Sequence, residues 1–255
     1  MPQPTAALVD QLLIGWLALA VLVFVVLLFV AAPYGRYLRS GFGPVVWARV
    51  GWFLMEIPAV LVVVALFGAS SRRHEPVAIV FFLLWQLHYV PRAVIDPLRA
   101  RHAVKALPLA IVLMGACFNV VNGGLQGSWL FWIGPGRASG WLLSPPFLAG
   151  TGLFLVGGLI NRSADAALRA LRPAGETGYF IPRGGLYERV SCPNYLGEIV
   201  QWLGWAVATW SLAGLAFAAW TIANLLPRAL AHHRWYRVRF ADYPAARRAL
   251  IPWLL

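Results

Sequence analysis

Charged residues are scarce in this chain, and those that occur are mostly basic. Of its 255 residues only 12% are charged while 60% are hydrophobic, and the mean hydropathy is +0.70. Soluble domains have about a quarter charged residues and about half apolar ones, so this composition indicates an integral membrane protein. The formal net charge of +12 would suggest nucleic-acid binding in a soluble protein. Basic cytosolic loops explain it here, and no nucleic-acid partner is expected.

Cysteine is also nearly absent, which limits the kinds of site that the chain can form. Cys117 lies in an apolar run and Cys192 in a basic loop, so neither a disulfide framework nor a zinc site is predicted. His232 and His233 are adjacent and would point about 100° apart on a helix, so no metal site is expected there. The sequence contains no G-x-G-x-x-G, which excludes a Rossmann dinucleotide fold. Any nucleotide would therefore be held by membrane helices and their loops.

Seven apolar runs predict an all-α membrane protein with seven transmembrane helices. A helix needs about 20 residues to cross the hydrocarbon core of a bilayer. The first run lacks a basic segment before it, so we interpret it as a retained helix and not as a cleaved signal peptide. The predicted helices lie near 8–31, 45–68, 76–96, 106–122, 143–163, 195–210 and 212–230. Residues 1–255 are predicted to form one integral membrane domain, with a tail at 231–255.

The distribution of Lys and Arg predicts the orientation of these helices. If the C-terminus is cytosolic and the N-terminus lies outside, all but three of the 21 Lys and Arg fall in cytosolic loops or in the tail. The exceptions are Arg72, Arg73 and Arg137. Because cytosolic loops of membrane proteins carry an excess of basic residues, this asymmetry supports both the orientation and the count of seven. No repeat relates two halves of the chain, which argues against a transporter.

Polar residues recur at helical spacing near the cytosolic ends of the last three predicted helices. The three rows are Asn161, Asp165, Arg169 and Arg172; Asn194 and Glu198; and Arg228, His232 and Tyr236. Several arginines among few acids favour an anionic ligand such as a phosphate. The alternative is a set of solvated helix ends.

Glu56 is the only acid near the middle of its apolar run, and Pro58 follows it two residues later. A carboxyl at this depth has little structural use, which makes it a candidate for function. Removal from water disfavours its charged form, so we expect Glu56 to stay protonated and to donate a hydrogen bond to a carbonyl. Tyr89, beside His88 in the third run, is a second possible donor; the alternative for Tyr89 is a core or interfacial tyrosine.

Long motifs in the C-terminal half resemble membrane steroid 5-alpha-reductases. The motifs are N-Y-L-G-E-I at 194–199, R-A-x-x-H-H-R-W-Y at 228–236 and D-Y-P-x-x-R-x-A-L-I-P at 242–252. The resemblance continues upstream through LRPAGETGYFIPRGG, through LHYVPR around Tyr89 and through WFLMEIP around Glu56.

The resemblance implies a seven-helix enzyme that uses NADPH to reduce the 4,5 double bond of a 3-oxo-4-ene steroid or sterol-like enone. It implies that Glu56 and Tyr89 form a catalytic pair that binds the ketone. We expect a multi-pass membrane protein whose membrane depends on the host: the bacterial inner membrane, which the Ala, Arg and Trp usage favours, or the endoplasmic reticulum of a eukaryote. The residues that it assigns to the cofactor are Tyr34, Arg36, Arg101, Asn161, Asp165, Arg172, Tyr179, Asn194, Glu198, Arg228, His232 and Tyr236.

Two other functions remain open from the sequence. An isoprenylcysteine-type membrane methyltransferase would also carry His, Arg and Tyr after a helical hairpin, but would bind S-adenosylmethionine and would not need Glu56 or Tyr89. A sterol-binding membrane protein without catalysis is the second alternative. The intact acid, tyrosine and polar rows favour the reductase.

Overall fold

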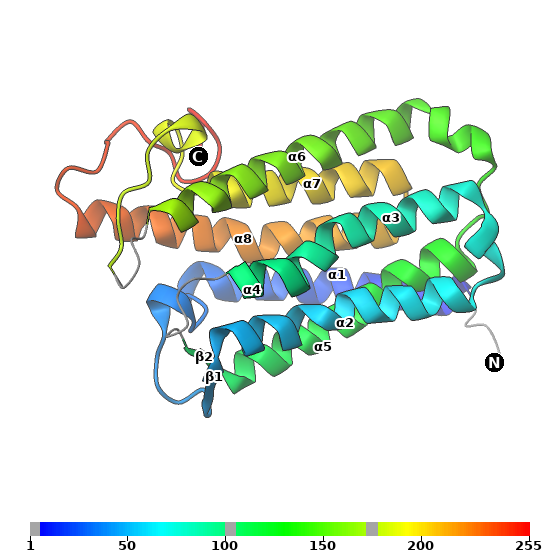
Figure 1. The fold of residues 1–255 in the computed structure, drawn as a ribbon, viewed down its shortest axis with the longest axis horizontal. Helices are drawn as coiled ribbons and strands as arrows, with labels where there is room; N and C mark the ends of the chain where they lie inside the picture. The colour runs from blue at the N-terminus through cyan, green and yellow to red at the C-terminus, as the bar shows by residue number, and fades with distance from the viewer. Residues whose placement is uncertain (1–5, 100–105, 172–177) are drawn as a thin grey trace. The chain divides into compact units, whose positions relative to one another are not determined.

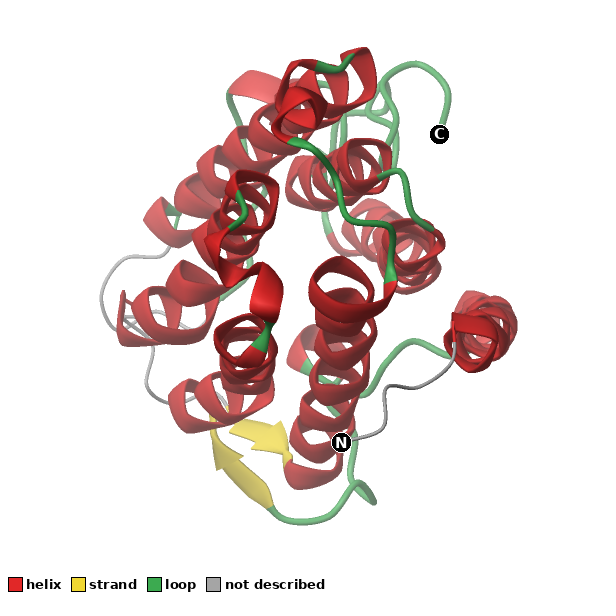
Figure 2. Cartoon of the chain, turned by 90° about the vertical axis from the view of Figure 1, so that its right-hand side faces the viewer, coloured by secondary structure: helices red, strands yellow, loops and turns green. Residues whose placement is uncertain are grey.

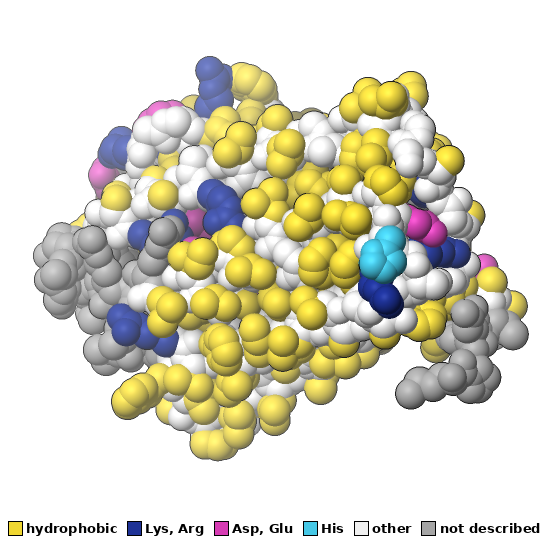
Figure 3. All heavy atoms as spheres, turned by 45° about the vertical axis from the view of Figure 1, so that its right-hand side comes forward, with side chains coloured by type: hydrophobic (Ala, Val, Ile, Leu, Met, Phe, Trp, Pro, Cys, Tyr) yellow, Lys and Arg dark blue, Asp and Glu magenta, His cyan; other side chains and the backbone are white. Residues whose placement is uncertain are grey.

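The protein is a multi-pass membrane protein built almost entirely of helices. The computed structural model describes residues 6–99, 106–171 and 178–255. Within them, six helices are long and apolar enough to cross a membrane. On the face drawn in Figure 3, hydrophobic side chains are the most widespread kind and charged side chains form a few small groups. This surface suits contact with lipid. Water favours the burial of apolar side chains, whereas lipid chains are apolar themselves and do not.

All seven predicted helices are present, with boundaries that differ by several residues (Figure 1). Six of them are long and apolar enough to cross a membrane. Helix α7, with 17 residues, is not among these six. Beyond α3, a π-helical turn at Pro91–Ile95 and the short α4 (Asp96–Arg99) continue the same span. The main helices are α1 (Ala6–Phe29), α2 (Ala48–Ala69), α3 (Pro76–Val90), α5 (Leu109–Ser128), α6 (Pro145–Ala170), α7 (Pro193–Thr209) and α8 (Leu212–Arg239).

A short antiparallel ribbon was not predicted. Strand β1 (Val45–Trp47) pairs with β2 (Ala106–Pro108), and Val46 lies opposite Leu107 (Figure 2). Leu107 precedes a proline, and the residue before proline favours extended backbone over helix. The helices expected to begin at 45 and 106 therefore start three residues later.

The chain divides into two compact units, which we describe separately. Unit 1 comprises the first part of α1, up to Gly15, and residues 33–148; unit 2 comprises residues 16–32 and 149–255. In unit 1, α2 packs along α5 through glycines. A Cβ at Gly123 would lie 3.6 Å from Val62, and a Cβ at Gly127 would lie 2.7 Å from Leu66. Small residues at such positions let membrane helices approach closely.

The turn after α2 is joined by hydrogen bonds to the π-helical turn Trp129–Ile133 that follows α5, and to Gly134 beyond it. Ser70 is fully buried, and its hydroxyl donates to the Phe131 carbonyl at 2.5 Å and accepts from the Arg72 N–H at 3.0 Å. Arg72 Nη1 in turn donates to the Gly134 carbonyl at 2.7 Å. This basic residue, one of three outside the predicted cytosolic set, therefore has a structural partner.

In unit 2, α6 and α7 run side by side (Figure 1) and touch through two pairs of glycines spaced seven residues apart. A Cβ at Gly204 would lie 2.6 Å from the Gly150 carbonyl oxygen, and a Cβ at Gly197 would lie 2.6 Å from that of Gly157. Real Cβ atoms do not approach this closely, so only glycine fits. The pairing of an early residue on one helix with a late residue on the other makes the two helices antiparallel.

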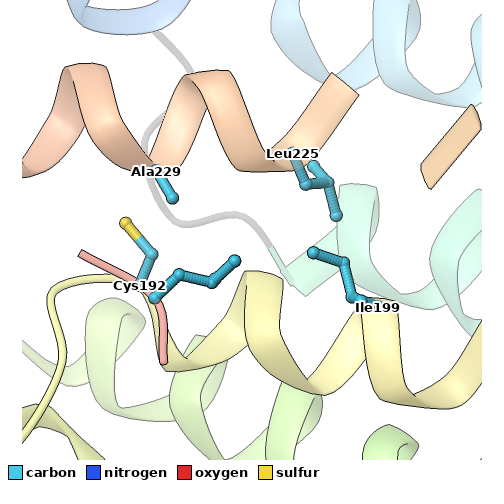
Figure 4. Packing of buried hydrophobic residues seen from close by; sticks show 5 residues of the cluster. Cys192, Ile199, Leu225 and Ala229 are labelled. Atoms are coloured by element: carbon cyan, nitrogen blue, oxygen red, sulfur yellow. The ribbon is translucent and has the colours of Figure 1, made fainter. Parts of the chain in front are cut away.

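Helices α7 and α8 form the predicted hairpin around Trp210 and Ser211. Trp210 has a φ of 44°, and the Ser211 side chain caps α8 by accepting from the Gly214 N–H at 3.0 Å. Along the hairpin, Ile199 of α7 and Leu225 of α8 point toward each other (Figure 4). The same apolar cluster contains Cys192, Ala229 and Leu250.

The segment after α8 folds back onto the loop before α7. Val190 and Arg248 form a parallel bridge, and the Cys192 N–H donates to the Ala249 carbonyl at 3.2 Å. Arg247 is 1% exposed and donates from Nη1 to the Pro182 carbonyl at 2.9 Å. Its Nη2 lies 3.5 Å from Glu188 Oε2. The predicted cytosolic tail is therefore part of the packed structure of unit 2.

We predict that Gly204→Ala destabilises the protein by about 1–3 kcal/mol, because an added methyl group would force apart two tightly packed backbones. Gly152→Ala on α6 is the matched control: nothing lies within 4 Å of its Cβ position, and alanine favours a helix by up to about 1 kcal/mol over glycine. Thermal unfolding in detergent measures both variants. Equal melting temperatures for the two would contradict the close contact.

The carboxylate of Glu188 predicts an acid-sensitive contribution to stability. Its pKa is lowered, chiefly because Oε1 accepts the Gly184 N–H at 2.6 Å and also because Arg247 is nearby. Because the pKa of Glu188 is lower in the folded protein than the reference value of 4.5 for the unfolded chain, its carboxylate stabilises the fold at pH values above 4.5. This stabilisation is lost as pH falls through the folded value. The melting temperature of the wild type should therefore exceed that of Glu188→Gln at pH 7. The difference between the two melting temperatures should disappear as the pH falls below that reference value.

The matched control is Asp242→Asn, whose side chain is 73% exposed and lies 3.8 Å from Arg183. Exposed ion pairs of this kind contribute little to the free energy of unfolding, so Asp242→Asn should hardly change the melting temperature. A gap between wild type and Glu188→Gln that stays constant with pH would rule out the proposed charge effect.

Candidate functional site

Glu56 of α2 is almost completely buried, at 5% exposure, and it has two polar partners within unit 1. Arg92 donates from Nε to Glu56 Oε1 at 2.9 Å, and Asn119 of α5 donates from Nδ2 to Oε2 at 3.4 Å. The Asn119 amide also donates to the Met55 carbonyl at 2.7 Å. Pro58 has no N–H to donate to the Leu54 carbonyl one turn earlier, and the Asn119 amide bonds the next carbonyl along α2, that of Met55.

These partners differ from the apolar surroundings that we expected for Glu56. Both carboxyl oxygens accept hydrogen bonds, and one donor is a guanidinium, which is charged at any physiological pH. Glu56 in this state is thus half of an ion pair with Arg92. It can donate a hydrogen bond only once it has taken up a proton.

Tyr89 lies on α3, is 3% exposed and is fixed by aromatic neighbours. Its ring centroid is 4.7 Å from that of Trp85 and 4.9 Å from that of His88. Trp85 donates from Nε1 to the Ala59 carbonyl of α2 at 2.9 Å, which ties the two helices together. Unit 1 therefore buries both members of the predicted pair, Glu56 and Tyr89, on packed helices.

Sequence reasoning missed the partners of Glu56. It assigned Arg92 to a basic loop and gave Asn119 no role. Two signals were available: Arg92 follows Tyr89 by three residues, or about one helical turn, and an amide within an apolar helix is costly unless it has a partner. One turn beyond Asn119, Asn122 is 1% exposed, and both of its amide atoms lack a hydrogen-bond partner among the described residues.

In unit 2, the structure brings the first two polar rows together. Asn161 of α6 donates from Nδ2 to the Asn194 carbonyl at 3.0 Å and to Glu198 Oε2 at 3.4 Å. Asn194 in turn donates from Nδ2 to Asp165 Oδ1 at 3.0 Å. The Gly197 contact with α6 lies within the same stretch of α7, so the close approach of the two helices makes these hydrogen bonds possible.

The third row joins this cluster through Tyr195, which sequence reasoning did not single out. Arg228 donates from Nε to the Tyr195 hydroxyl at 3.1 Å, and the same oxygen lies 3.2 Å from His232 Nε2. His232 is 7% exposed and Tyr236, one turn further on, is 4% exposed. A hydroxyl directly after Asn194 in the N-Y-L-G-E-I motif was the available signal.

A second unpredicted tyrosine, Tyr187, borders the cluster. Its hydroxyl donates to the Ala164 carbonyl at 3.2 Å and is buried. Burial, followed by the charge of Asp165, raises its pKa well above the ordinary range. Tyr187 therefore stays protonated and acts as a fixed donor.

The remaining predicted nucleotide residues are not joined to this cluster by the contacts above. Tyr34 and Arg36 lie in unit 1, at the short helical turn Gly35–Tyr37. Tyr179 lies in unit 2 with its ring centroid 5.1 Å from that of Trp235. Arg101 and Arg172 lie outside the described residues.

The donor set of the cluster suits a phosphate-bearing nucleotide. Arg228 and His232 offer cationic or N–H donors for phosphate oxygens, while Asp165 and Glu198 offer acceptors for hydroxyl or amide groups. Within the described residues, no group of three or more His, Cys, Asp or Glu could hold a metal ion. The cluster brings donors and acceptors of α6, α7 and α8 together at one place.

Comparison with known proteins gives a consistent match. Residues 105–255 match the family model described as 3-oxo-5-alpha-steroid 4-dehydrogenase. The chain is 41% identical over 252 residues to 3-oxo-5-alpha-steroid 4-dehydrogenase 1 of Bos taurus, with 97% of each chain covered. It is 42% identical over 232 residues to steroid 5-alpha-reductase DET2 of Gossypium hirsutum, covering 89% of this chain and 90% of that protein. The corresponding Arabidopsis thaliana protein is 39% identical over 236 residues, with 90% of each covered.

We predict that Arg92→Met destabilises the protein, because it leaves the Glu56 carboxylate buried without its cation. Removing one partner of a buried pair costs about 3–5 kcal/mol. Arg92 is 30% exposed, so solvent screening reduces the expected loss to about 1–2 kcal/mol. The double variant Glu56→Gln/Arg92→Met should recover much of that loss in thermal unfolding. Equal losses in the single and double variants would show that the ion pair does not stabilise α2.

Proposed function

This chain belongs to the 3-oxo-5-alpha-steroid 4-dehydrogenase family, and from that premise we propose that it reduces the 4,5 double bond of a 3-oxo-4-ene steroid with NADPH. The observation that carries the cofactor assignment is the hydrogen-bonded cluster of α6, α7 and α8. Its combination of guanidinium, imidazole and carboxylate groups fits a nucleotide. A steroid or sterol-like enone is the matching apolar substrate.

We assign nucleotide binding to the cluster residues and to the five other predicted positions, Tyr34, Arg36, Arg101, Arg172 and Tyr179. Asn161, Asp165, Asn194 and Glu198 hold and orient the nucleotide, and Arg228, His232 and Tyr236 supply donors to its phosphates and ribose. When bound, the nicotinamide supplies a hydride. NADPH carries one phosphate more than NADH. We assign NADPH because the proposed site contains several basic residues that can bind this phosphate.

Glu56 and Tyr89 bind the ketone oxygen of the substrate in this proposal. Negative charge develops on that oxygen as the β-carbon accepts the hydride, so a donor aimed at it stabilises the transition state. Tyr89 donates its phenolic hydrogen. Glu56 is the second donor after it takes up a proton, and Arg92 and Asn119 hold its two oxygens in place.

The family premise disfavours the alternatives left open by the sequence, a methyltransferase and a sterol-binding protein without catalysis. We further propose that the whole chain acts as one reductase domain with seven membrane helices, in which α7 is the short seventh. The N-terminus would then lie outside and the C-terminus in the cytosol, as the basic residues favour. The host membrane would be the bacterial inner membrane or the endoplasmic reticulum.

The test is oxidation of NADPH by detergent-purified protein with testosterone, a 3-oxo-4-ene steroid, and product mass as the readout. A gain of two hydrogens that requires both NADPH and steroid is the expected result. Binding of NADPH without turnover of several such enones would remove the substrate assignment. Absence of NADPH binding together with binding of S-adenosylmethionine would favour the methyltransferase.

We predict that Tyr89→Phe lowers kcat about 10²–10³-fold, the usual loss when one donor to a developing oxyanion is removed. The dissociation constant for NADPH should stay within about twofold, because Tyr89 lies outside the nucleotide cluster. Glu56→Gln keeps a donor and should retain measurable turnover, roughly tenfold below wild type, which corresponds to about 1.4 kcal/mol. Tyr37→Phe, on the turn after α1, is the matched control. Wild-type kcat in Tyr89→Phe would remove Tyr89 from the mechanism.

A further inference from the structure

One serine joins three separate segments of unit 2. Ser191, just before α7, is 4% exposed. Its Oγ lies 2.7 Å from His233 Nδ1 of α8, 2.6 Å from the Tyr243 hydroxyl and 3.1 Å from the Arg248 carbonyl oxygen. We call Ser191, His233 and Tyr243 the Ser191 network.

The three contacts use every hydrogen-bonding site of the hydroxyl. A serine hydroxyl has one hydrogen to donate and two lone pairs to accept with. The Arg248 carbonyl can only accept, so the hydrogen of Ser191 is used there. The other two contacts are then hydrogen bonds when the Tyr243 hydroxyl and the His233 tautomer with hydrogen on Nδ1 donate to Ser191. Burial raises the pKa of Tyr243, so its hydroxyl keeps the hydrogen that it donates. Loss of Ser191 Oγ would therefore leave two donors without their acceptor.

Each member of the network lies near a different residue of the proposed nucleotide cluster, in sequence or by stacking. Ser191 precedes Asn194 by three residues at the start of α7, and His233 is the neighbour of His232 on α8. Tyr243 stacks on Tyr236, with ring centroids 5.3 Å apart and planes within 9°. The network thus joins the beginning of α7, the end of α8 and the segment that follows α8.

From this arrangement we infer that the Ser191 network positions the α7 and α8 rows relative to each other for NADPH, without touching the cofactor. The inference rests on the proposed function, in which those rows bind the nucleotide. Ser191, His233 and Tyr243 are then positioning residues. Their effect falls on cofactor affinity, because the rows that they position bind the nucleotide in this proposal, whereas Glu56 and Tyr89 bind the ketone of the substrate.

The test compares NADPH dissociation constants by quenching of tryptophan fluorescence with steady-state kinetics. Ser191→Ala should raise both the dissociation constant and KM for NADPH about tenfold, as expected for unpaired buried donors. The value of kcat at saturating NADPH should stay within about twofold. Tyr243→Phe keeps the stacking on Tyr236 and loses one hydrogen bond, so its effect should be about threefold. In the double variant the effect should not exceed that of Ser191→Ala, because both substitutions break one network.

Ser211→Ala is the matched control, since it removes a partly buried serine contact at the opposite end of the α7–α8 hairpin, where Ser211 caps α8. It should lower the melting temperature without changing NADPH affinity. Wild-type affinity in a folded Ser191→Ala, or the same affinity loss in Ser211→Ala, would overturn the inference. If Ser191→Ala does not fold, Tyr243→Phe decides by the same criterion. Failure of the wild type to bind NADPH would instead reject the proposed function.

Discussion

Unit 2 depends on the direct contact between the backbones of α6 and α7. Gly150 faces Gly204 and Gly157 faces Gly197, at distances that exclude any side chain. In a lipid environment the hydrophobic effect does not drive helices together, so close packing and polar contacts have to do so. The contact at Gly157 and Gly197 also sets Asn161 against the first turns of α7. The same constraint therefore builds the helix pair and places the polar groups that bind a nucleotide in our proposal.

In unit 1, by contrast, a few buried polar groups are stabilised by hydrogen bonds from neighbouring helices. Glu56 has Arg92 and Asn119, while the α2 carbonyls of Ala59 and Leu66 accept hydrogen bonds from indole N–H groups of Trp85 and Trp132. A helix that carries an acid and a proline in an apolar environment would be costly without such donors. The surrounding helices thus make it possible to keep an ionisable group at this depth.

The helices were predictable because apolar runs of this length have few other stable structures in a membrane. The polar rows were predictable from their spacing, since residues four apart share a helix face. The partners across helices were not, because periodicity within one segment says nothing of which residue on another helix faces it. Arg92 and Tyr195 were missed for this reason, and the ribbon at Val45–Trp47 was missed because three residues carry no periodic signal.

The return of the segment around Arg247 to the loop before α7 has a consequence for biosynthesis. Chains are made from the N-terminus onward, so α6, α7 and α8 are complete before this segment exists. Until Arg247 reaches the Pro182 carbonyl and Arg248 pairs beside Val190, the start of α7 has its contacts with α6 and α8 but lacks those of this segment. A chain whose synthesis stops before Arg247 can therefore insert all its long helices and still lack the contacts that this segment makes with the loop before α7.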